Sequence, residues 1–202
     1  MTVRQIIDLA KNSELNGLSV SSKDDVILSW INLGVLELYK RFQLKVSEYI
    51  VTLEDGVDIY KMPSDYMWII AAYGEVDARS TETVNQLPIN EEDNPLSVNT
   101  VGWNKIQIPV SINGAYVSII YVASPEVYVV TELDAEVDIP PQMIETLLAY
   151  VGYKANSAID SGVQTEDNAW YIRFDASCNK LREYGMGNGD DMFMSKRLST
   201  RV

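Results

Sequence analysis

The fold is decided by the stretch from Ser22 to Phe42, which reads SKDDVILSWINLGVLELYKRF. Ser22 followed by Asp25 is typical of a helix N-terminus, so we predict a helix over 22–42. Its apolar residues leave only a narrow polar stripe, and they are Val26, Ile27, Trp30, Ile31, Leu33, Val35, Leu36, Leu38, Tyr39 and Phe42. A helix this apolar has to be covered on most sides. It lies either at the centre of a bundle or against another subunit. In the second case the candidate subunit contacts are Trp30, Leu33, Tyr39 and Phe42.

Three further helices are predicted, one before this stretch and two near the other end of the chain. Thr2 and Gln5 match a capping box at the start of the first helix. Pro141 suits the first turn of the third helix, and Thr165 caps the fourth, which three glycines within 185–189 bring to an end. The apolar faces contain Ile6, Leu9 and Ala10 in the first helix, Met143, Ile144, Leu147, Leu148, Val151 and Ala155 in the third, and Trp170, Phe174, Cys178 and Leu181 in the fourth.

Between the second and third helices the chain has the pattern of short strands. The predicted strands are 46–53, 57–61, 67–77, 105–110, 115–123, 127–131 and 136–139. Gly56 predicts a hairpin turn between the first two strands, and Asn113-Gly114 predicts a second hairpin between 105–110 and 115–123. Residues 78–100 form a long polar excursion with no helix or strand period.

These elements predict an α+β protein. Residues 1–44 and 140–186 form a four-helix bundle from both ends of the chain, and residues 45–139 form an inserted, acidic antiparallel β-sandwich or barrel. Residues 187–202 form a flexible C-terminal tail. Because the bundle is built from both ends, we expect the two ends to lie near each other.

The residue types present favour no catalytic or metal site. The chain has no histidine, which excludes Ser-His-Asp and Cys-His nucleophiles and the commonest zinc ligand. Cys178 lies on an apolar helical stripe, so we assign it to core packing. Carboxylates such as Glu91-Glu92-Asp93 and Asp190-Asp191 could bind a hard cation or act as a hydrolase pair, but they lack the ligand spacing of a calcium loop. We therefore expect no enzyme, no metal and no cofactor.

The charge is unevenly distributed along the chain. Of the net charge of −13, residues 45–139 carry −12, with sixteen acids and four bases. Such a segment repels phosphate, because nucleic-acid affinity comes largely from Lys and Arg. Its partners are therefore proteins, or it lets DNA pass without binding, or its acids on exposed strands simply keep the protein soluble. We expect Glu91, Glu92 and Asp93 to form an acidic loop, a candidate to face a channel or a partner. The single cysteine favours a reducing site of synthesis, and no signal-peptide pattern or apolar run suited to a membrane is present.

The C-terminal tail combines apolar anchors with positive charge. A segment of this kind could become ordered on a partner surface, although frayed termini are common. Its candidate contact residues are Met192, Phe193, Met194, Lys196, Arg197, Leu198 and Arg201.

Together these features resemble the head-to-tail adaptor (connector) proteins of short-tailed bacteriophages. The resemblance rests on Ile139-Pro140-Pro141-Gln142-Met143-Ile144, the helix through Lys154-Ala155, the ending Leu181-Arg182-Glu183-Tyr184-Gly185, the tail residues Asp190, Phe193, Leu198 and Thr200-Arg201, and the opening helix Val26 to Phe42. It implies a structural virion protein made in a bacterial cytoplasm. It further implies a twelve-copy ring under the portal protein that extends the DNA channel and presents a platform for a tail or nozzle protein. The tail residues would contact the portal.

Three other functions stay open at this stage. A tail-tube, tail-terminator or nozzle protein would assemble without portal. A carbohydrate-binding β-sandwich module would use strand tyrosines such as Tyr116, Tyr121 and Tyr128, which are also ordinary strand formers. A carboxylate hydrolase would lose activity when its Glu or Asp residues are replaced.

Overall fold

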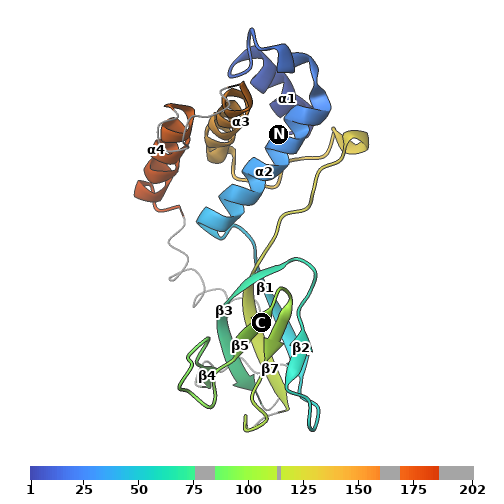
Figure 1. The fold of residues 1–202 in the computed structure, drawn as a ribbon, viewed down its shortest axis with the longest axis vertical. Helices are drawn as coiled ribbons and strands as arrows, with labels where there is room; N and C mark the ends of the chain where they lie inside the picture. Colours follow the sequence, from blue (N-terminus) through green and yellow to red (C-terminus); the bar gives the residue numbers. More distant parts are fainter. Residues whose placement is uncertain (76–84, 113–114, 160–168, 187–202) are drawn as a thin grey trace. The chain divides into compact units, whose positions relative to one another are not determined.

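The computed structural model describes residues 1–75, 85–112, 115–159 and 169–186. Within them lie four α-helices, three short 3₁₀ helices and antiparallel sheets, which confirms the predicted α+β class. The chain divides into two compact units (Figure 1). Met1–Leu44 and Pro125–Asn188 form one, called here the helical unit, and Lys45–Ser124 forms the described part of the other, the β unit. No helix in the described ranges is long and apolar enough to cross a membrane.

The first helix begins as predicted. Helix α1 spans Val3–Asn12, and Thr2 is its N-cap. The Gln5 amide donates to Thr2 Oγ1 at 3.3 Å, and the Thr2 amide donates to Gln5 Oε1 at 3.0 Å. This reciprocal pair satisfies two amides that have no partner inside the helix, which confirms the capping box.

Helix α2 spans Asp24–Phe42, so its predicted cap is wrong. Ser22 belongs to a 3₁₀ turn, Ser19–Ser22, and its hydroxyl donates back to the Ser19 carbonyl at 3.4 Å. Lys23 is the N-cap residue and makes no side-chain cap bond. Asp24 and Asp25 instead place negative charge in the first turn, where the helix dipole favours it.

Helix α3, Ile144–Ile159, is the element that joins the helical unit together, because it packs against α1, α2 and α4. Gly34 of α2 faces it so closely that an added Cβ would lie 2.5 Å from Leu147 Cδ1 and 2.9 Å from Tyr150 Cδ1. Pro141 lies in the 3₁₀ turn Pro141–Met143 that leads into α3, as its position in the sequence indicated. Close approach of α2 therefore depends on glycine at position 34.

Helix α4, Ala169–Glu183, carries the predicted apolar stripe: Phe174, Cys178 and Leu181 are buried, and Trp170 is half-buried. Gly185 has a φ of +80° and ends the helix. Its amide donates to the Arg182 carbonyl at 2.9 Å, and the Met186 amide donates to the Leu181 carbonyl at 3.1 Å, which is the Schellman arrangement. The predicted cap Thr165 and Gly187 and Gly189 lie outside the described residues.

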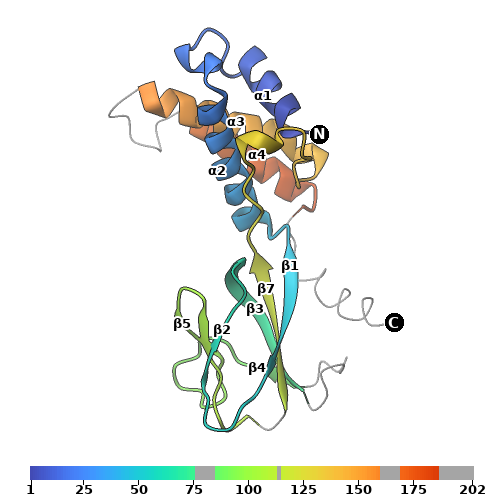
Figure 2. The ribbon, with the colours of Figure 1, turned by 90° about the vertical axis from the view of Figure 1, so that its right-hand side faces the viewer.

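The β unit contains two antiparallel sheets (Figure 2). The first has the order β1-β7-β3-β4, from Val46–Thr52, Tyr116–Ala123, Tyr66–Glu75 and Gln86–Leu87. The second has the order β2-β6-β5, from Ile59–Lys61, Lys105–Gln107 and Asn99–Gly102. One buried cluster takes side chains from both sheets, including Ala72, Val117, Ile119 and Ile106. The polar excursion 78–100 therefore contains the short strand β4 and the first two residues of β5, which its composition did not indicate.

Both predicted hairpins are wrong. β1 does not pair with β2, because β1 pairs with β7 over seven residues from Val46↔Val122 to Thr52↔Tyr116. β6 and β7 flank the predicted Asn113-Gly114 turn, yet they belong to different sheets. Gly56 does adopt a positive φ of 78°, so the turn exists without the hairpin. Local turn chemistry was outweighed by long-range strand pairing and burial.

Residues 125–139 also differ from the prediction. The strands expected at 127–131 and 136–139 do not form, and Val130–Glu132 is a 3₁₀ turn. This segment groups with the helices instead of the β unit. Its backbone is bound to the first turn of α1, since the Val3 amide donates to Ala135 at 3.0 Å, the Arg4 amide to Leu133 at 2.8 Å, and the Val137 amide to Met1 at 2.9 Å.

Candidate functional site

The helical unit exposes a group of apolar side chains, called here the valine strip. It consists of Leu33, Val127, Val129 and Val130, whose exposed fractions are 46%, 73%, 44% and 58%. Single exposed apolar residues are normal, but several from two neighbouring segments are typical of an interaction surface. The valine strip is therefore the candidate contact surface of this unit.

The two segments of the valine strip are held together by Asn32. Its side-chain amide donates to the Tyr128 carbonyl at 2.9 Å, and its side-chain oxygen accepts from the Tyr128 amide at 2.9 Å. Leu33 follows Asn32 in α2, and Val127 and Val129 flank Tyr128. One side chain thus substitutes for the strand partner that this extended segment lacks.

A second set of hydrogen bonds fixes the same segment to α2. The Tyr39 hydroxyl donates to Asp138 at 2.8 Å, and the Asp138 amide donates to the Tyr128 hydroxyl at 2.8 Å. Burial, followed by the hydrogen bond and the charge of Asp138, raises the pKa of Tyr39, and burial raises the pKa of Tyr128. Both hydroxyls therefore stay protonated and able to donate at neutral pH.

The four predicted subunit contacts occupy different environments. Tyr39 and Phe42 are only 1% and 4% exposed and pack within this chain's own core. Trp30 is half-buried against that core, and Leu33 is exposed. Of these four residues, Leu33 and the open part of Trp30 are thus accessible on the surface, whereas Tyr39 and Phe42 are covered by their own chain.

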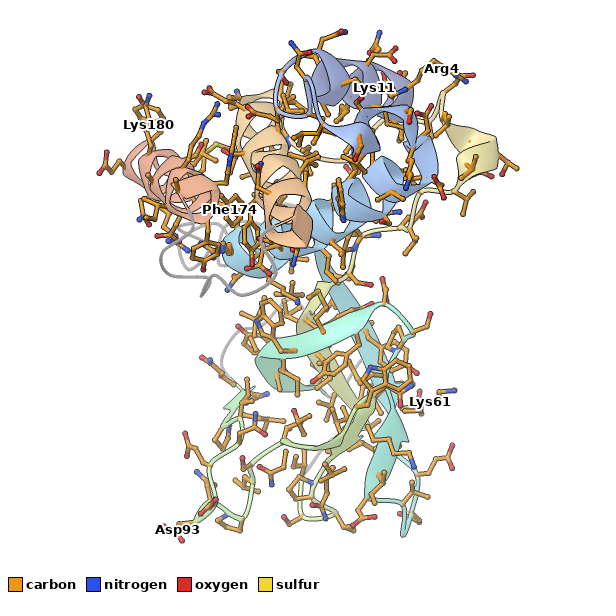
Figure 3. The ribbon with its side chains drawn as sticks, turned by 45° about the horizontal axis from the view of Figure 1, so that its top comes forward. Arg4, Lys11, Lys61, Asp93, Phe174 and Lys180 are labelled. Carbon is orange, nitrogen blue, oxygen red and sulfur yellow. The ribbon has the colours of Figure 1, made fainter. Side chains whose placement is uncertain are left out.

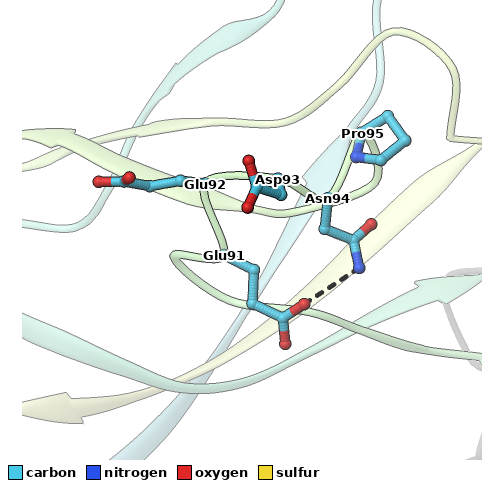
Figure 4. A pocket seen from close by; sticks show the side chains of 5 residues that line it. All are labelled: Glu91, Glu92, Asp93, Asn94 and Pro95. Carbon is cyan, nitrogen blue, oxygen red and sulfur yellow. Dashed lines mark hydrogen bonds between the residues drawn. The ribbon is translucent and has the colours of Figure 1, made fainter.

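The predicted acidic loop is exposed and well ordered by hydrogen bonds (Figure 4). Asn94 Nδ2 donates to Glu91 Oε2 at 3.0 Å, and the Glu91 amide donates to Ser97 Oγ at 2.9 Å. Glu92 and Asp93 project from the outer part of the loop. Within the described ranges no three Cys, Asp or Glu side chains are grouped as ligands of a metal ion.

The negative charge predicted for residues 45–139 is shared between the two units. Lys45–Ser124 contains eleven acids and four bases, a net charge of −7, and residues 125–139 contain five acids and no base. Those five acids are exposed on the segment that also carries Val127, Val129 and Val130, and Asp134 is paired with Arg4 at 2.9 Å. Both units therefore present acidic surface.

The remaining predicted residues do not form a site in the described structure. Tyr121 is buried, Tyr116 is half-buried, and Tyr128 belongs to the helical unit. Cys178 is fully buried, and burial raises its pKa to about 11, which confirms its assignment to the core. The portal-contact candidates Met192, Phe193, Met194, Lys196, Arg197, Leu198 and Arg201 lie outside the described residues.

Sequence reasoning missed two features of these surfaces. The first is the pairing of Asn32 with Tyr128, and its only signal was a polar residue on a largely apolar helix. The second is Trp103, which is 81% exposed in the turn between β5 and β6. A large aromatic residue between Gly102 and Asn104 could have marked a turn that carries a contact residue.

Comparison with known proteins assigns the family. Residues 1–199 match the family profile described as SU10 adaptor protein. The chain belongs to the SU10 adaptor protein family. This confirms, at the family level, the resemblance to phage adaptor proteins that the sequence indicated.

Two further comparisons add little to the SU10 adaptor assignment. A search of curated proteins finds no match. Among solved structures the chain is similar to one from the neck of an empty GTA particle computed with C6 symmetry, at 10% identity over 86% of this chain and 88% of that chain, with a TM-score of 0.29. Because a TM-score this low does not establish a shared fold, the family match alone assigns the chain.

Proposed function

We propose that this SU10 adaptor protein is a structural, non-catalytic virion component. It forms a ring under the portal protein, extends the DNA channel and provides the platform to which a tail or nozzle protein attaches. The observation that carries this proposal is the family match over residues 1–199, since it covers nearly the whole chain. Following the phage adaptors that the sequence resembles, the ring has twelve copies.

In this proposal the helical unit builds the body of the ring, with its four helices acting as the predicted bundle. The valine strip of one copy is covered by the next copy. Support comes from the exposure of Leu33, Val127, Val129 and Val130 on a segment that is fixed rigidly by Asn32 and Tyr39. Burial of about four such side chains contributes several kcal/mol to association, before its entropic costs.

The acidic composition suits a DNA channel. Lys45–Ser124 carries a net charge of −7, and residues 125–139 carry −5. A wall of this sign repels the phosphate backbone, so DNA would pass without adhering. DNA is therefore a passing cargo in this proposal and not a bound ligand.

The test is assembly with the portal protein of the same phage. Static light scattering of the purified protein should report a monomer, and addition of portal should give a complex whose mass includes many copies of this chain. A tail-tube, terminator or nozzle protein would instead polymerise alone. A protein that stays monomeric beside intact portal would contradict the adaptor role.

A further inference from the structure

The outer face of the second sheet carries a pair of like charges. Lys61 of β2 and Lys105 of β6 are register partners and are both exposed. Neither ammonium group forms an ion pair with a side chain in the described part of the chain. Like charges directly opposite each other destabilise a sheet, so the fold itself gains nothing from this pair.

Exposed apolar side chains lie near the two lysines in the same sheet. Ile59 is two residues from Lys61 and is 50% exposed, and Val101 of β5 is 47% exposed. Trp103 follows in the turn to β6 and is 81% exposed. Exposed Trp beside positive charge is the composition of a binding hot spot, since a covered Trp buries about 150–250 Å². Ile59, Lys61, Val101, Trp103 and Lys105 are called here the basic face.

The charge of the rest of the unit indicates what binds there. DNA is disfavoured, because the basic face belongs to a unit with a net charge of −7. The complementary surface occurs on the same unit, at the acidic loop, where Glu92, Asp93 and the 42%-exposed Leu96 project. In Figure 3, Lys61 and Asp93 lie on different sides of the β unit, so the two surfaces do not neutralise each other within one copy.

We propose that the basic face of one copy binds the acidic loop of a second copy of this chain. Lys61 and Lys105 pair with Glu92 and Asp93, and Trp103 covers Leu96. The contact joins two different surfaces. Each copy therefore binds one neighbour through its basic face and another through its acidic loop, and contacts of this kind can close into a ring. It rests on the proposed function in one respect, namely that a ring places each copy between two others.

The acidic loop is already arranged for such a contact. Asn90 has a φ of +52°, and its side-chain oxygen accepts from the Thr100 amide at 2.8 Å. The Leu96 amide donates to Asn94 Oδ1 at 3.1 Å, and buried Ser97 donates to Asn99 Oδ1 at 2.9 Å. A loop held by its own hydrogen bonds loses little conformational freedom on binding, which favours association.

The experiment is a charge exchange in the full chain. The first variant is Lys61→Glu with Lys105→Glu, and the second is Glu92→Lys with Asp93→Lys. Glu91 is left unchanged because it binds Asn94 within the loop. Each variant alone should lose contact between copies, because both of its surfaces have the same sign. A mixture of the two, or a chain carrying all four changes, should restore it. The matched control is Lys23→Glu with Lys40→Glu, two exposed lysines of the helical unit that change the net charge equally.

The readout is carbodiimide coupling between copies, which joins only touching amines and carboxylates. Mixed ¹⁵N-labelled and unlabelled protein identifies inter-copy products by mass spectrometry, for the concentrated protein alone and for its complex with portal. We expect coupling of Lys61 or Lys105 to Glu92 or Asp93 in the wild type, weakened by salt, and coupling between the same positions in the mixture and in the four-change chain. Each single exchange has only carboxylates or only amines on both surfaces, so it serves as the uncoupled reference, and we expect the other samples to exceed it about tenfold or more. Circular dichroism checks that every variant is folded.

Two outcomes would overturn the inference: absence of this coupling in both preparations, or no recovery in the mixture and the four-change chain. Binding of a DNA fragment by the wild type that is lost in Lys61→Glu with Lys105→Glu, together with no coupling of Lys61 or Lys105 to Glu92 or Asp93 in the wild type, would assign the basic face to nucleic acid instead and overturn it too. Portal binding is scored separately with the wild-type chain. Coupling without portal binding would remove only the adaptor proposal, and portal binding without coupling would remove only this inference.

Discussion

Single polar side chains decide whether the valine strip has a fixed shape. Asn32 supplies both hydrogen bonds that the Tyr128 backbone makes to α2. In Asn32→Ala the half-buried amide and carbonyl of Tyr128 lose their partner, so we expect the free energy of unfolding to fall by about 1–2 kcal/mol. Urea denaturation measures this. Ser29→Ala is the control, because Ser29 is exposed and bonds only within α2, at Val26. Equal stability of the two variants would contradict the role given to Asn32.

Cys178 should make stability depend on pH. Burial raises its pKa from 9.0 to about 11, so the unfolded chain releases the thiol proton at lower pH than the folded chain. The resulting stabilisation is fully present below pH 9.0 and is lost as pH rises to about 11. Measured against Cys178→Ala, the free energy of unfolding of the wild type should fall across this window. Tyr150, whose pKa burial raises to about 12, titrates in both proteins and cancels. Parallel pH curves would contradict the prediction.

At the level of elements, helix starts that look alike in the sequence are not equivalent. Thr2 makes both bonds of a capping box, whereas Ser22 bonds back to Ser19 and does not cap α2. We therefore expect Thr2→Ala to lower the free energy of unfolding by about 1 kcal/mol, and Ser22→Ala to change it by less than about 0.5 kcal/mol. Thermal or urea unfolding compares them. A larger effect at Ser22 would contradict the observed cap.

The helices could be predicted because their signals are local. The Thr2-Gln5 box, Pro141 and the Phe174, Cys178 and Leu181 stripe each depend on neighbours within a few residues. The strand order could not be predicted, because β1 pairs with β7 about 70 residues away and no turn residue encodes that choice. The same limit explains 127–131: its valines fit a strand, but no strand pairs with it, and its backbone is bound to α2 through the Asn32 side chain.

The candidate surfaces were predicted only in part. Exposure of Leu33 and of Glu91, Glu92 and Asp93 agrees with their predicted roles as accessible residues. Tyr39 and Phe42 could not be separated from Leu33 by sequence, since all lie on one apolar helix and burial depends on which faces α3 and the 125–139 segment cover. Trp103 was missed because its one local signal, its place between Gly102 and Asn104, marks a turn but does not show that the indole is exposed.

At the scale of the whole molecule, we expect the residues that stabilise the fold to differ from those that bind the portal. Removal of residues 187–202, which lie outside the described residues, should leave the melting temperature within a few degrees of the wild type while abolishing binding to portal. The physical reason is the proposal, carried over from the resemblance to phage adaptors, that Met192, Phe193 and Met194, with their neighbouring bases, anchor the chain on the portal. Calorimetry with portal co-sedimentation tests this. Unchanged portal binding would remove the tail contact and leave the ring unaffected.

The most direct test of the central claim is electron cryomicroscopy of the neck isolated from virions of the phage that encodes this chain. The account predicts a closed ring of copies with the helical-unit fold directly beneath the portal, with the valine strip covered by a neighbouring copy. A portal followed directly by a different protein, with this chain absent from the neck or found only in the tail tube, would contradict it.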